Sequence, residues 1–342
     1  MSNETTPERP KAEELYLPAT GTWPASRYLL DGESQDAIKL AEACGRPLLV
    51  RGLPGTGKSD LARAAAEYLE RAFVYEVVTA RTEPQDLLWR FDAIARLADA
   101  QALGASVKIK TDPTKANHYV SPGVLWWAIN WTLAEQQLAP PCHANAQRPD
   151  RTLTLLNEDV IQQQVRAKTK GCVLLLDEID KADSELPNSL LEVLANTGFR
   201  LPWDEEIKSD NIPRPVIIIT TNEDRELPPA FVRRCLVLNI EVDKDFTAWI
   251  KERARVHFRD PKQTDSDMTL PALSQDLLNK AATYLEADRK ASEGDSSMPG
   301  LAEYLDLLRG LEHLAPNDEV RQQQWLERVY KFAYQKQVII SR

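Results

Sequence analysis

The stretch Gly52-Leu53-Pro54-Gly55-Thr56-Gly57-Lys58-Ser59 constrains the fold more than any other part of the chain. Two glycines separated by four residues, followed by a lysine and a hydroxyl residue, form the P-loop pattern. The apolar run 48–50 before it predicts a short buried strand, and the spacing of apolar residues over 60–71 predicts a helix after it. A turn between a strand and a helix N-terminus cradles phosphate, because backbone N–H groups and the helix dipole point at the anion.

The residues of this turn have different parts in holding a triphosphate. The glycines leave room for the phosphates and tolerate unusual backbone angles, while Lys58 is predicted to reach the β- and γ-phosphates and Ser59 to bind Mg²⁺. A glycine-rich turn that arises by chance is the alternative, and the flanking strand and helix argue against it. The sequence therefore predicts a nucleoside triphosphate site, with ligand contacts at Gly52, Pro54, Gly55, Thr56, Gly57, Lys58, Ser59 and Asp60.

A pair of acids follows another strongly apolar stretch. Val173–Leu176 has the unbroken apolar character of a strand buried on both faces, and Asp177 and Glu178 come directly after it. Ligands bind at the carboxyl ends of strands in open α/β sheets, so Asp177 is predicted to share the Mg²⁺ with Ser59, and Glu178 to polarise the attacking water. The alternative is that the two acids only begin the next helix, where carboxylates favour the dipole. The P-loop upstream favours the catalytic interpretation.

A third polar group closes the apolar run 216–219. Thr220-Thr221-Asn222 follows this run directly, so a polar side chain there is placed to reach the γ-phosphate or the attacking water from a neighbouring strand. The alternative is a turn or helix cap, for which asparagine is also favoured.

The remaining patterns divide the chain into a strand-containing part and a helical part. Residues 1–25 hold several prolines among polar residues and predict an extended or partly disordered lead-in, which Trp23 and Tyr16 could anchor. Strands are predicted at 48–50, 73–79, 173–176, 216–219 and 236–240. Beyond 243 only helices are predicted, near 246–258, 274–287, 301–314 and 319–336. This places an α/β core at 26–243 and a helical domain at 244–342.

Residues 83–150 are predicted to be an insertion in the core. Four of the eight tryptophans fall in it, namely Trp89, Trp126, Trp127 and Trp131. We expect them to pack rather than to contact a ligand, although an exposed subset would mark a partner surface. A loop is predicted around 138–148, and a hairpin or loop over 199–214.

Composition excludes several classes of protein. The formal net charge of −10 argues against a protein whose main task is to hold a nucleic-acid backbone. Cys44, Cys142, Cys172 and Cys235 have no metal-ligand or redox spacing, and the neighbouring pair Cys142-His143 stands alone. The sequence shows no secretion signal and no apolar run long enough to span a membrane, so the expected location is cytoplasmic.

The order of these motifs resembles that of AAA+ ATPases. The resemblance covers about residues 28–320 and is carried by Gly52–Ser59, Leu174–Glu178, Asn222 and Arg233-Arg234 with a helical region after them. Within that family the chain is similar to the MoxR group, through Arg46-Pro47-Leu48-Leu49, Asp177–Ala182 and the aromatic part of the insertion, Tyr119–Trp127. The resemblance implies a doubly wound parallel sheet of order 5-1-4-3-2, a C-terminal α-helical lid, and ATP as the nucleotide.

By position, the resemblance also implies roles for individual residues. Asp177 and Glu178 resemble the Walker B pair and Asn222 the sensor 1 residue, while the insertion and the 199–214 hairpin resemble elements that face the ring's pore or its client. Arg233 or Arg234 resembles the arginine finger, which acts on the neighbouring subunit's nucleotide; two arginines before a strand are otherwise a solvated charge pair.

One position departs from the family. Family members often carry a sensor 2 arginine after a proline at the start of a lid helix, where this chain has Met298-Pro299-Gly300-Leu301. Arg309 on the same helix is a weak substitute.

The motifs predict a Mg²⁺-dependent ATPase, and the resemblance implies that it forms a homo-oligomeric ring, usually a hexamer, and remodels a protein partner. The resemblance to MoxR implies a von Willebrand factor A-type partner with a chaperone-like role, or a component of a defence system. Two alternatives come from other classes. A nucleic-acid motor of restriction type is disfavoured by the acidic charge, and a non-hydrolysing ATP-dependent scaffold by the intact Lys58, Asp177, Glu178 and arginine pair.

Overall fold

The computed structural model describes residues 9–21, 23–104, 112–139, 142, 158–209, 213–241, 245–261, 270–291 and 299–334. Three sequence predictions fall wholly or partly outside these residues. They are the lead-in before residue 9, most of the loop around 138–148 including His143, and the boundary at 243. These stay predictions.

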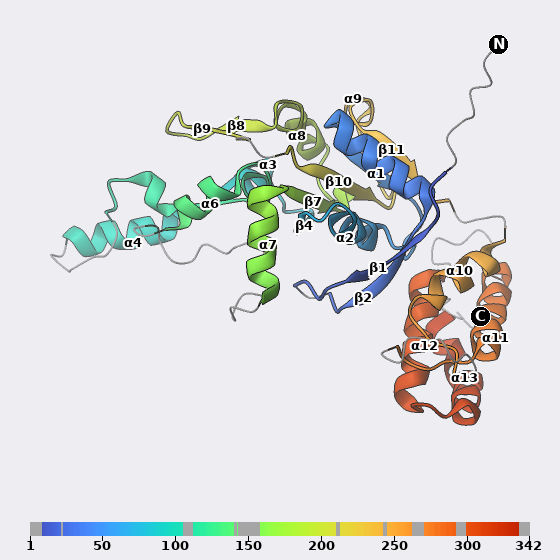
Figure 1. Ribbon diagram of the computed structural model, residues 1–342. Coiled ribbons are helices and arrows are strands. Elements are labelled where there is room, and N and C mark those ends of the chain that lie inside the picture. The colour runs from blue at the N-terminus through green and yellow to red at the C-terminus, as the bar shows by residue number, and fades with distance from the viewer. Residues whose placement is uncertain are drawn as a thin grey trace, which may run out of the picture.

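A five-stranded parallel sheet forms the centre of the α/β part (Figure 1). In chain order its strands are β3 (Leu48–Arg51), β4 (Ala72–Val77), β7 (Cys172–Asp177), β10 (Val216–Thr221) and β11 (Leu236–Asn239). They lie in the order β11-β3-β10-β7-β4, which is the predicted order 5-1-4-3-2 when the strands are numbered along the chain. The fold class is confirmed: a parallel sheet of this topology, followed by C-terminal helices.

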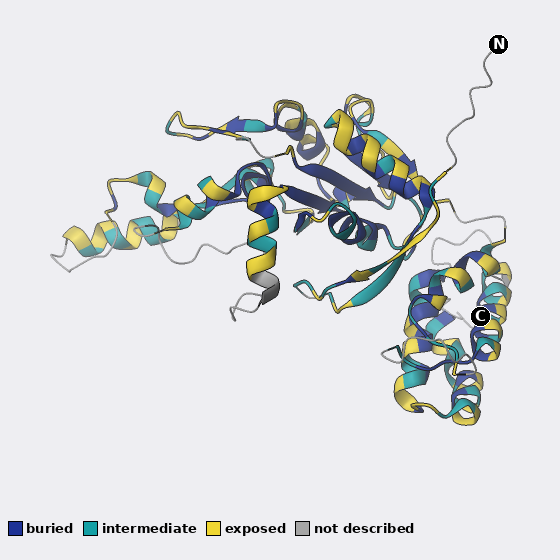
Figure 2. Ribbon diagram, viewed as in Figure 1, coloured by how far each residue is buried: buried dark blue, intermediate teal, exposed yellow. Residues whose placement is uncertain are grey.

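Alternating strand residues enter two separate apolar layers. On one face Val50, Leu175 and Ile218 pack with α1 (Gly32–Cys44) and α2 (Lys58–Tyr68). On the other face Leu49, Leu176 and Ile219 pack with α5 (Val124–Ile129), α8 (Glu185–Asn196) and α9 (Pro229–Val232). Both faces of the sheet are therefore buried, as the unbroken apolar runs predicted, and β7 and β10 have the dark blue of buried residues in Figure 2.

A β-hairpin at the N-terminal end was not predicted. β1 (Glu13–Leu17) pairs antiparallel with β2 (Ser26–Leu30) and lies over α2. Trp23 in the connecting turn packs against Tyr75 of β4, with ring centroids 4.6 Å apart and the ring planes tilted by 41°, so this tryptophan does anchor the segment. Tyr16 does not, because its side chain is 62% exposed.

The insertion packs against the sheet at one end and extends away from it at the other. It contains α3 (Pro84–Leu88), β5 (Trp89–Phe91), α4 (Ala93–Gly104), the 3₁₀ turn η1 (Ala116–Tyr119), β6 (Val120–Pro122), α5 and α6 (Trp131–Leu138). Trp126, Trp127 and Trp131 are buried in the core, so their predicted packing role is confirmed. α4 has no buried residue and projects beyond the rest of the α/β part in Figure 1.

Trp127 offers a direct test of this packing. It is 1% exposed and meets Trp131 edge to face at 4.9 Å between centroids. We expect Trp127→Ala to lower the free energy of unfolding by about 3–5 kcal/mol, because a large cavity is left beside the sheet. Chemical denaturation measures this, with Ile94→Ala on α4 as the control. Ile94 is 84% exposed, so its loss should change stability by less than about 0.5 kcal/mol. Equal effects of the two substitutions would contradict the packing argument.

Three further elements complete the α/β part. α7 (Glu158–Thr169) runs along the edge strand β4, where the side chain of Gln163 accepts a bond of 3.1 Å from the backbone N–H of Phe73. A short helical turn, η2 (Ile179–Lys181), follows β7. A hairpin of β8 (Gly198–Arg200) and β9 (Glu206–Lys208) lies within the predicted segment 199–214, apart from one residue at its start.

The C-terminal helices have an apolar core of their own. α10 (Phe246–Arg255), α11 (Gln275–Ala291), α12 (Leu301–Leu314) and α13 (Glu319–Tyr334) pack around buried leucines and aromatic residues. The start of α12 reaches the P-loop, since the backbone N–H of Ala302 donates to the carbonyl of Gly55 at 3.2 Å. In the described part of the chain, no helix is both long and apolar enough to cross a membrane.

Candidate nucleotide site

The glycine-rich turn connects the end of β3 to the first residue of α2, Lys58. Gly57 has φ +87°, a left-handed conformation that side chains disfavour. A Cβ added there would also lie 3.3 Å from Cε2 of Tyr28. The hydroxyl of Thr56 donates to the carbonyl of Leu53 at 2.9 Å and closes the turn. Gly57, Lys58 and Ser59 at the start of α2 line the cavity.

Lys58 lies along the inside of the turn. Its ammonium donates to the carbonyls of Gly52 at 2.7 Å and Leu53 at 3.0 Å. Burial lowers the pKa of Lys58, and the nearby carboxylates, Asp177 first, act in the opposite direction. A positive charge held at this point is placed to meet an anion bound in the turn.

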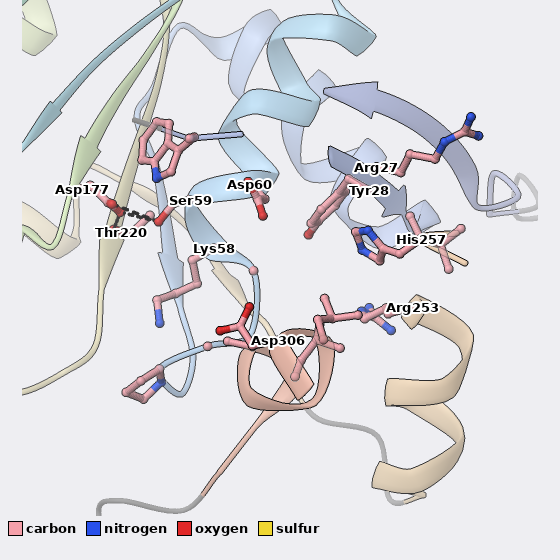
Figure 3. Close-up of a pocket in the computed structure, with 18 of the residues that line it drawn as sticks. Arg27, Tyr28, Lys58, Ser59, Asp60, Asp177, Thr220, Arg253, His257 and Asp306 are labelled. Carbon is pink, nitrogen blue, oxygen red and sulfur yellow. Dashed lines mark hydrogen bonds between the residues drawn. The ribbon is translucent and has the colours of Figure 1, made fainter. Parts of the chain in front are cut away.

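Asp177 at the end of β7 meets the start of α2. The hydroxyl of Ser59 lies 2.9 Å from both carboxylate oxygens, and the hydroxyl of Thr220 donates to Oδ1 at 2.6 Å (Figure 3). Burial raises the pKa of Asp177, while the bonds from Thr220 and Ser59 lower it. The start of α2 and the first residue of the acidic pair therefore lie in contact. A carboxylate beside a hydroxyl fits Mg²⁺, which binds one or two carboxylates together with substrate phosphates.

Glu178 has a left-handed backbone conformation and bonds to β10, the strand beside β7. Its φ is +58°, in the left-handed region that non-glycine residues avoid. Its backbone N–H donates to the hydroxyl of Thr220 at 2.8 Å. On its carboxylate, Oε1 accepts from the side-chain amide of Asn222 at 3.2 Å, and Oε2 pairs with Lys181. Strained conformations of this kind cluster at functional sites.

A buried carboxylate with no predicted role, Asp180, supports Asn222. Asp180 is 2% exposed, and its Oδ2 accepts from the backbone N–H of Asn222 at 3.2 Å and of Asp224 at 3.0 Å. Its Oδ1 has no hydrogen-bond partner among the described residues. Thr220 was also missed, although it links both members of the acidic pair. Their positions in the sequence are what could have indicated these two residues. Asp180 lies two residues after Glu178, and Thr220 belongs to the polar end of β10.

Asp180 allows a test of how Asn222 is positioned. We expect Asp180→Ala to lower kcat for nucleotide hydrolysis by about 10- to 100-fold with KM nearly unchanged, because the loop that carries Asn222 loses its anchor. Asp180→Asn should keep most of the activity, since an amide oxygen can accept the same two backbone bonds. Steady-state phosphate release measures both. If the alanine and asparagine variants are equally impaired, the carboxylate has a role other than anchoring this loop.

A cavity of about 340 Å³ lies between these groups and the C-terminal helices. This volume lies within the range of small-ligand sites. The lining residues are Trp23, Arg27, Tyr28, Leu29, Pro54, Gly55, Gly57, Lys58, Ser59, Asp60, Asp177, Glu178, Thr220, Asn222, Arg253, His257, Leu301, Ala302, Leu305, Asp306 and Arg309. The predicted contacts Gly52 and Thr56 belong to the same turn but are not part of this lining.

The far wall of the cavity comes from β2 and the C-terminal helices (Figure 3). Burial, followed by the charges of Arg309 and Arg27, lowers the pKa of His257 to about 4, so this imidazole is neutral near pH 7. Arg309 lines this wall, whereas the start of α12 places Ala302 against the P-loop. α12 therefore contacts the P-loop through the small side chain of Ala302 and through the hydrogen bond from its backbone N–H to Gly55.

Arg233 and Arg234 lie apart from the residues of this cavity. Both are exposed at the end of α9 and neither lines the cavity. In the described residues, no group of three or more His, Cys, Asp or Glu side chains is arranged to hold a metal without further ligands.

Comparisons with known proteins agree with a nucleotide site. Residues 35–202 match the family described as the AAA ATPase domain, a little under half of the chain, and the match includes Lys58, Ser59, Asp177 and Glu178. Residues 35–202 are thus similar to AAA ATPase domains. No curated protein matches the sequence.

Two solved structures illustrate the similarity in three dimensions. A RuvB variant of Thermotoga maritima is 12% identical with a TM-score of 0.40, over 88% of this chain and 68% of that one. NtrX of Brucella abortus in complex with ATP is 14% identical with a TM-score of 0.41, over 84% of this chain and 51% of that one.

Proposed function

We propose that the chain hydrolyses ATP with Mg²⁺ in the cavity between the P-loop and the C-terminal helices. The observation that carries the proposal is the contact of Ser59 with Asp177 at 2.9 Å, beside Lys58 and facing the Glu178–Asn222 pair. The AAA ATPase domain match supports the choice of reaction. The residues proposed to contact the nucleotide are Gly52, Pro54, Gly55, Thr56, Gly57, Lys58, Ser59, Asp60 and Asp177.

The chemistry divides among the residues at the two strand ends. Lys58 and the backbone N–H groups of the turn would hold the phosphates. Ser59 and Asp177 would hold Mg²⁺, which when bound would neutralise charge on the phosphate oxygens. Glu178 accepts a proton from water as the water oxygen bonds to the γ-phosphorus and the bond to the ADP oxygen breaks. Asn222 fixes the carboxylate of Glu178 through their hydrogen bond.

The assembly that we propose is a homo-oligomeric ring, with six subunits as in the MoxR group that the sequence resembles. Arg233 or Arg234 would complete the neighbouring subunit's site, which their exposure outside their own cavity supports. The proposed work is remodelling of a protein partner in the cytoplasm, with a von Willebrand factor A-type protein or a defence-system component as the candidates. The apolar, exposed face of α4 and the net charge of −10 favour a protein over a nucleic acid.

Purified protein tests the proposal. We expect phosphate release from ATP that requires Mg²⁺, and an ATP-dependent shift to a ring on size-exclusion chromatography with light scattering. ATP binding without phosphate release would support a scaffold instead. Turnover that rises with added DNA and falls with salt would support a nucleic-acid motor. Failure to bind ATP would overturn the whole proposal.

A further inference from the structure

Arg46 makes an unusual contact at the end of α9. Its Nη2 donates to the carbonyl of Arg233 at 2.6 Å and of Cys235 at 3.0 Å, and its Nε donates to the carbonyl of Arg234 at 3.1 Å. One guanidinium therefore binds three consecutive backbone carbonyls. Arginine suits this task, because its donors form a rigid planar fork.

These carbonyls lie where the chain leaves a helix of only four residues. Carbonyls at a helix end have no partner within the helix, and a helix this short has little stability of its own. The N–H groups of Arg46 are the donors to these carbonyls. Arg46 lies just before β3 and is 187 residues away from Arg233 in sequence. The neighbouring bond from the N–H of Leu236 to the carbonyl of Pro47, at 2.8 Å, joins the same two segments.

The contact fixes the backbone of the two exposed arginines. Arg233 and Arg234 are the residues whose carbonyls are bound, so their Cα positions depend on Arg46 directly. Arg46 is itself exposed, and so are its bonds to these two residues. Water can replace bonds at such a site, so their loss costs little folding free energy. Arg46 therefore affects geometry more than stability.

We propose that Arg46 is a positioning residue that sets the arginine pair for action on the nucleotide of an adjacent subunit. This inference rests on the proposed function, and it adds a role for an arginine that touches neither nucleotide nor cavity. Displacing a catalytic group by about 1 Å can reduce the rate 100-fold. The exposed arginines would lose their alignment without Arg46 while each subunit's own cavity stayed intact.

Single variants give the first test. We expect Arg46→Ala to lower kcat of the assembled protein by about 10- to 100-fold while the Kd for a fluorescent ATP analogue stays within about twofold. Arg46→Lys should not restore activity, because one ammonium cannot reproduce the planar fork. Arg321→Ala is the matched control, since Arg321 on α13 is exposed and pairs only with Asp318, the residue before this helix, among the ion pairs of the described residues. A loss of nucleotide affinity in Arg46→Ala equal to the loss of kcat would overturn the proposal.

Mixed rings test whether the effect passes between subunits. Arg46→Ala subunits keep their own site, and Glu178→Gln subunits keep their arginine pair, so an interface between the two contains one complete site. We expect the mixture to release more phosphate than the sum of the two separate samples. A mixture of the Arg233→Ala/Arg234→Ala double variant with Glu178→Gln should recover in the same way.

The outcomes separate the inference from the function on which it rests. An inactive wild-type protein would overturn the proposed ATPase. Recovery with the double arginine variant but not with Arg46→Ala would overturn the role of Arg46 alone. No recovery with either would show that the arginine pair does not act between subunits, and the role of Arg46 would fall with it.

Discussion

Replacing Glu178 with glutamine is expected to lower ATP turnover by about 10²- to 10⁴-fold and to leave ATP affinity within about twofold. Glutamine keeps the size of the side chain and can still bond to Asn222, which now donates to Glu178 at 3.2 Å. It cannot accept a proton from water. Lys58, Ser59 and Asp177 are untouched, so the triphosphate is still held. Phosphate release and equilibrium binding of a fluorescent ATP analogue measure the two effects separately.

Glu185→Gln is the matched control for this substitution. Glu185 begins α8 and is exposed, so the same chemical change there should leave turnover within about twofold. If Glu178→Gln hydrolyses ATP at the wild-type rate, Glu178 is not the proton acceptor and the mechanism fails. The trapped ATP-bound form also offers a route to the partner, because a stable companion protein should co-purify with it.

The site was predictable where its residues are neighbours in sequence. Gly52–Ser59 and Asp177-Glu178 each form a continuous motif that directly follows an apolar strand. Strands buried on both faces read as unbroken apolar runs, which placed β3, β7 and β10. Parallel strands bring their carboxyl ends to one edge, and this explains why two motifs more than a hundred residues apart meet at 2.9 Å. The strand order itself came from the family resemblance.

The supporting residues could not be predicted because they depend on strand register. Ile219 pairs with Leu176, so Thr220 lies opposite Asp177. A shift of one residue would turn Thr220 to the other face of the sheet. Asp180 and Arg46 bond to backbone atoms far away in sequence, and no local pattern records such contacts. The β1–β2 hairpin was not predicted, because its two strands are only five residues long and contain charged residues, and prolines lie close to both.

The start of α12 approaches the P-loop closely. The N–H of Ala302 bonds to the carbonyl of Gly55, so the helix approaches the turn through its backbone. A Cβ at Gly55 would lie 3.1 Å from the Cβ of Ala302, which leaves little space for a long side chain there. Arg309 instead lines the far wall with His257 and Arg27. At Gly300 itself an added Cβ would meet only the carbonyl oxygen of Pro54 at 3.5 Å and Oε2 of Glu303 at 3.8 Å, so the close approach is at Ala302 and not at Gly300.

Removing the arginine pair is expected to have the largest effect on turnover. An arginine finger contributes about 10³- to 10⁵-fold to kcat by stabilising charge in the transition state. One of the two variants, Arg233→Ala or Arg234→Ala, removes the finger. We expect that variant to reduce turnover of the assembled ring by about 10³- to 10⁵-fold, and the other variant to have a much smaller effect. ATP affinity should change little, because neither residue lines the cavity of its own subunit. Phosphate release from rings whose assembly is checked by light scattering measures the difference.

Protein concentration distinguishes action between subunits from action within one. If the finger belongs to a neighbour, wild-type turnover per subunit should fall on dilution below the assembly threshold, to the level of the finger variant. At that dilution the two proteins should be indistinguishable, because a lone subunit has no neighbour to complete its site. An equal loss of activity for the variant in strictly monomeric samples would contradict this, since it would require Arg233 or Arg234 to reach a cavity that neither residue lines.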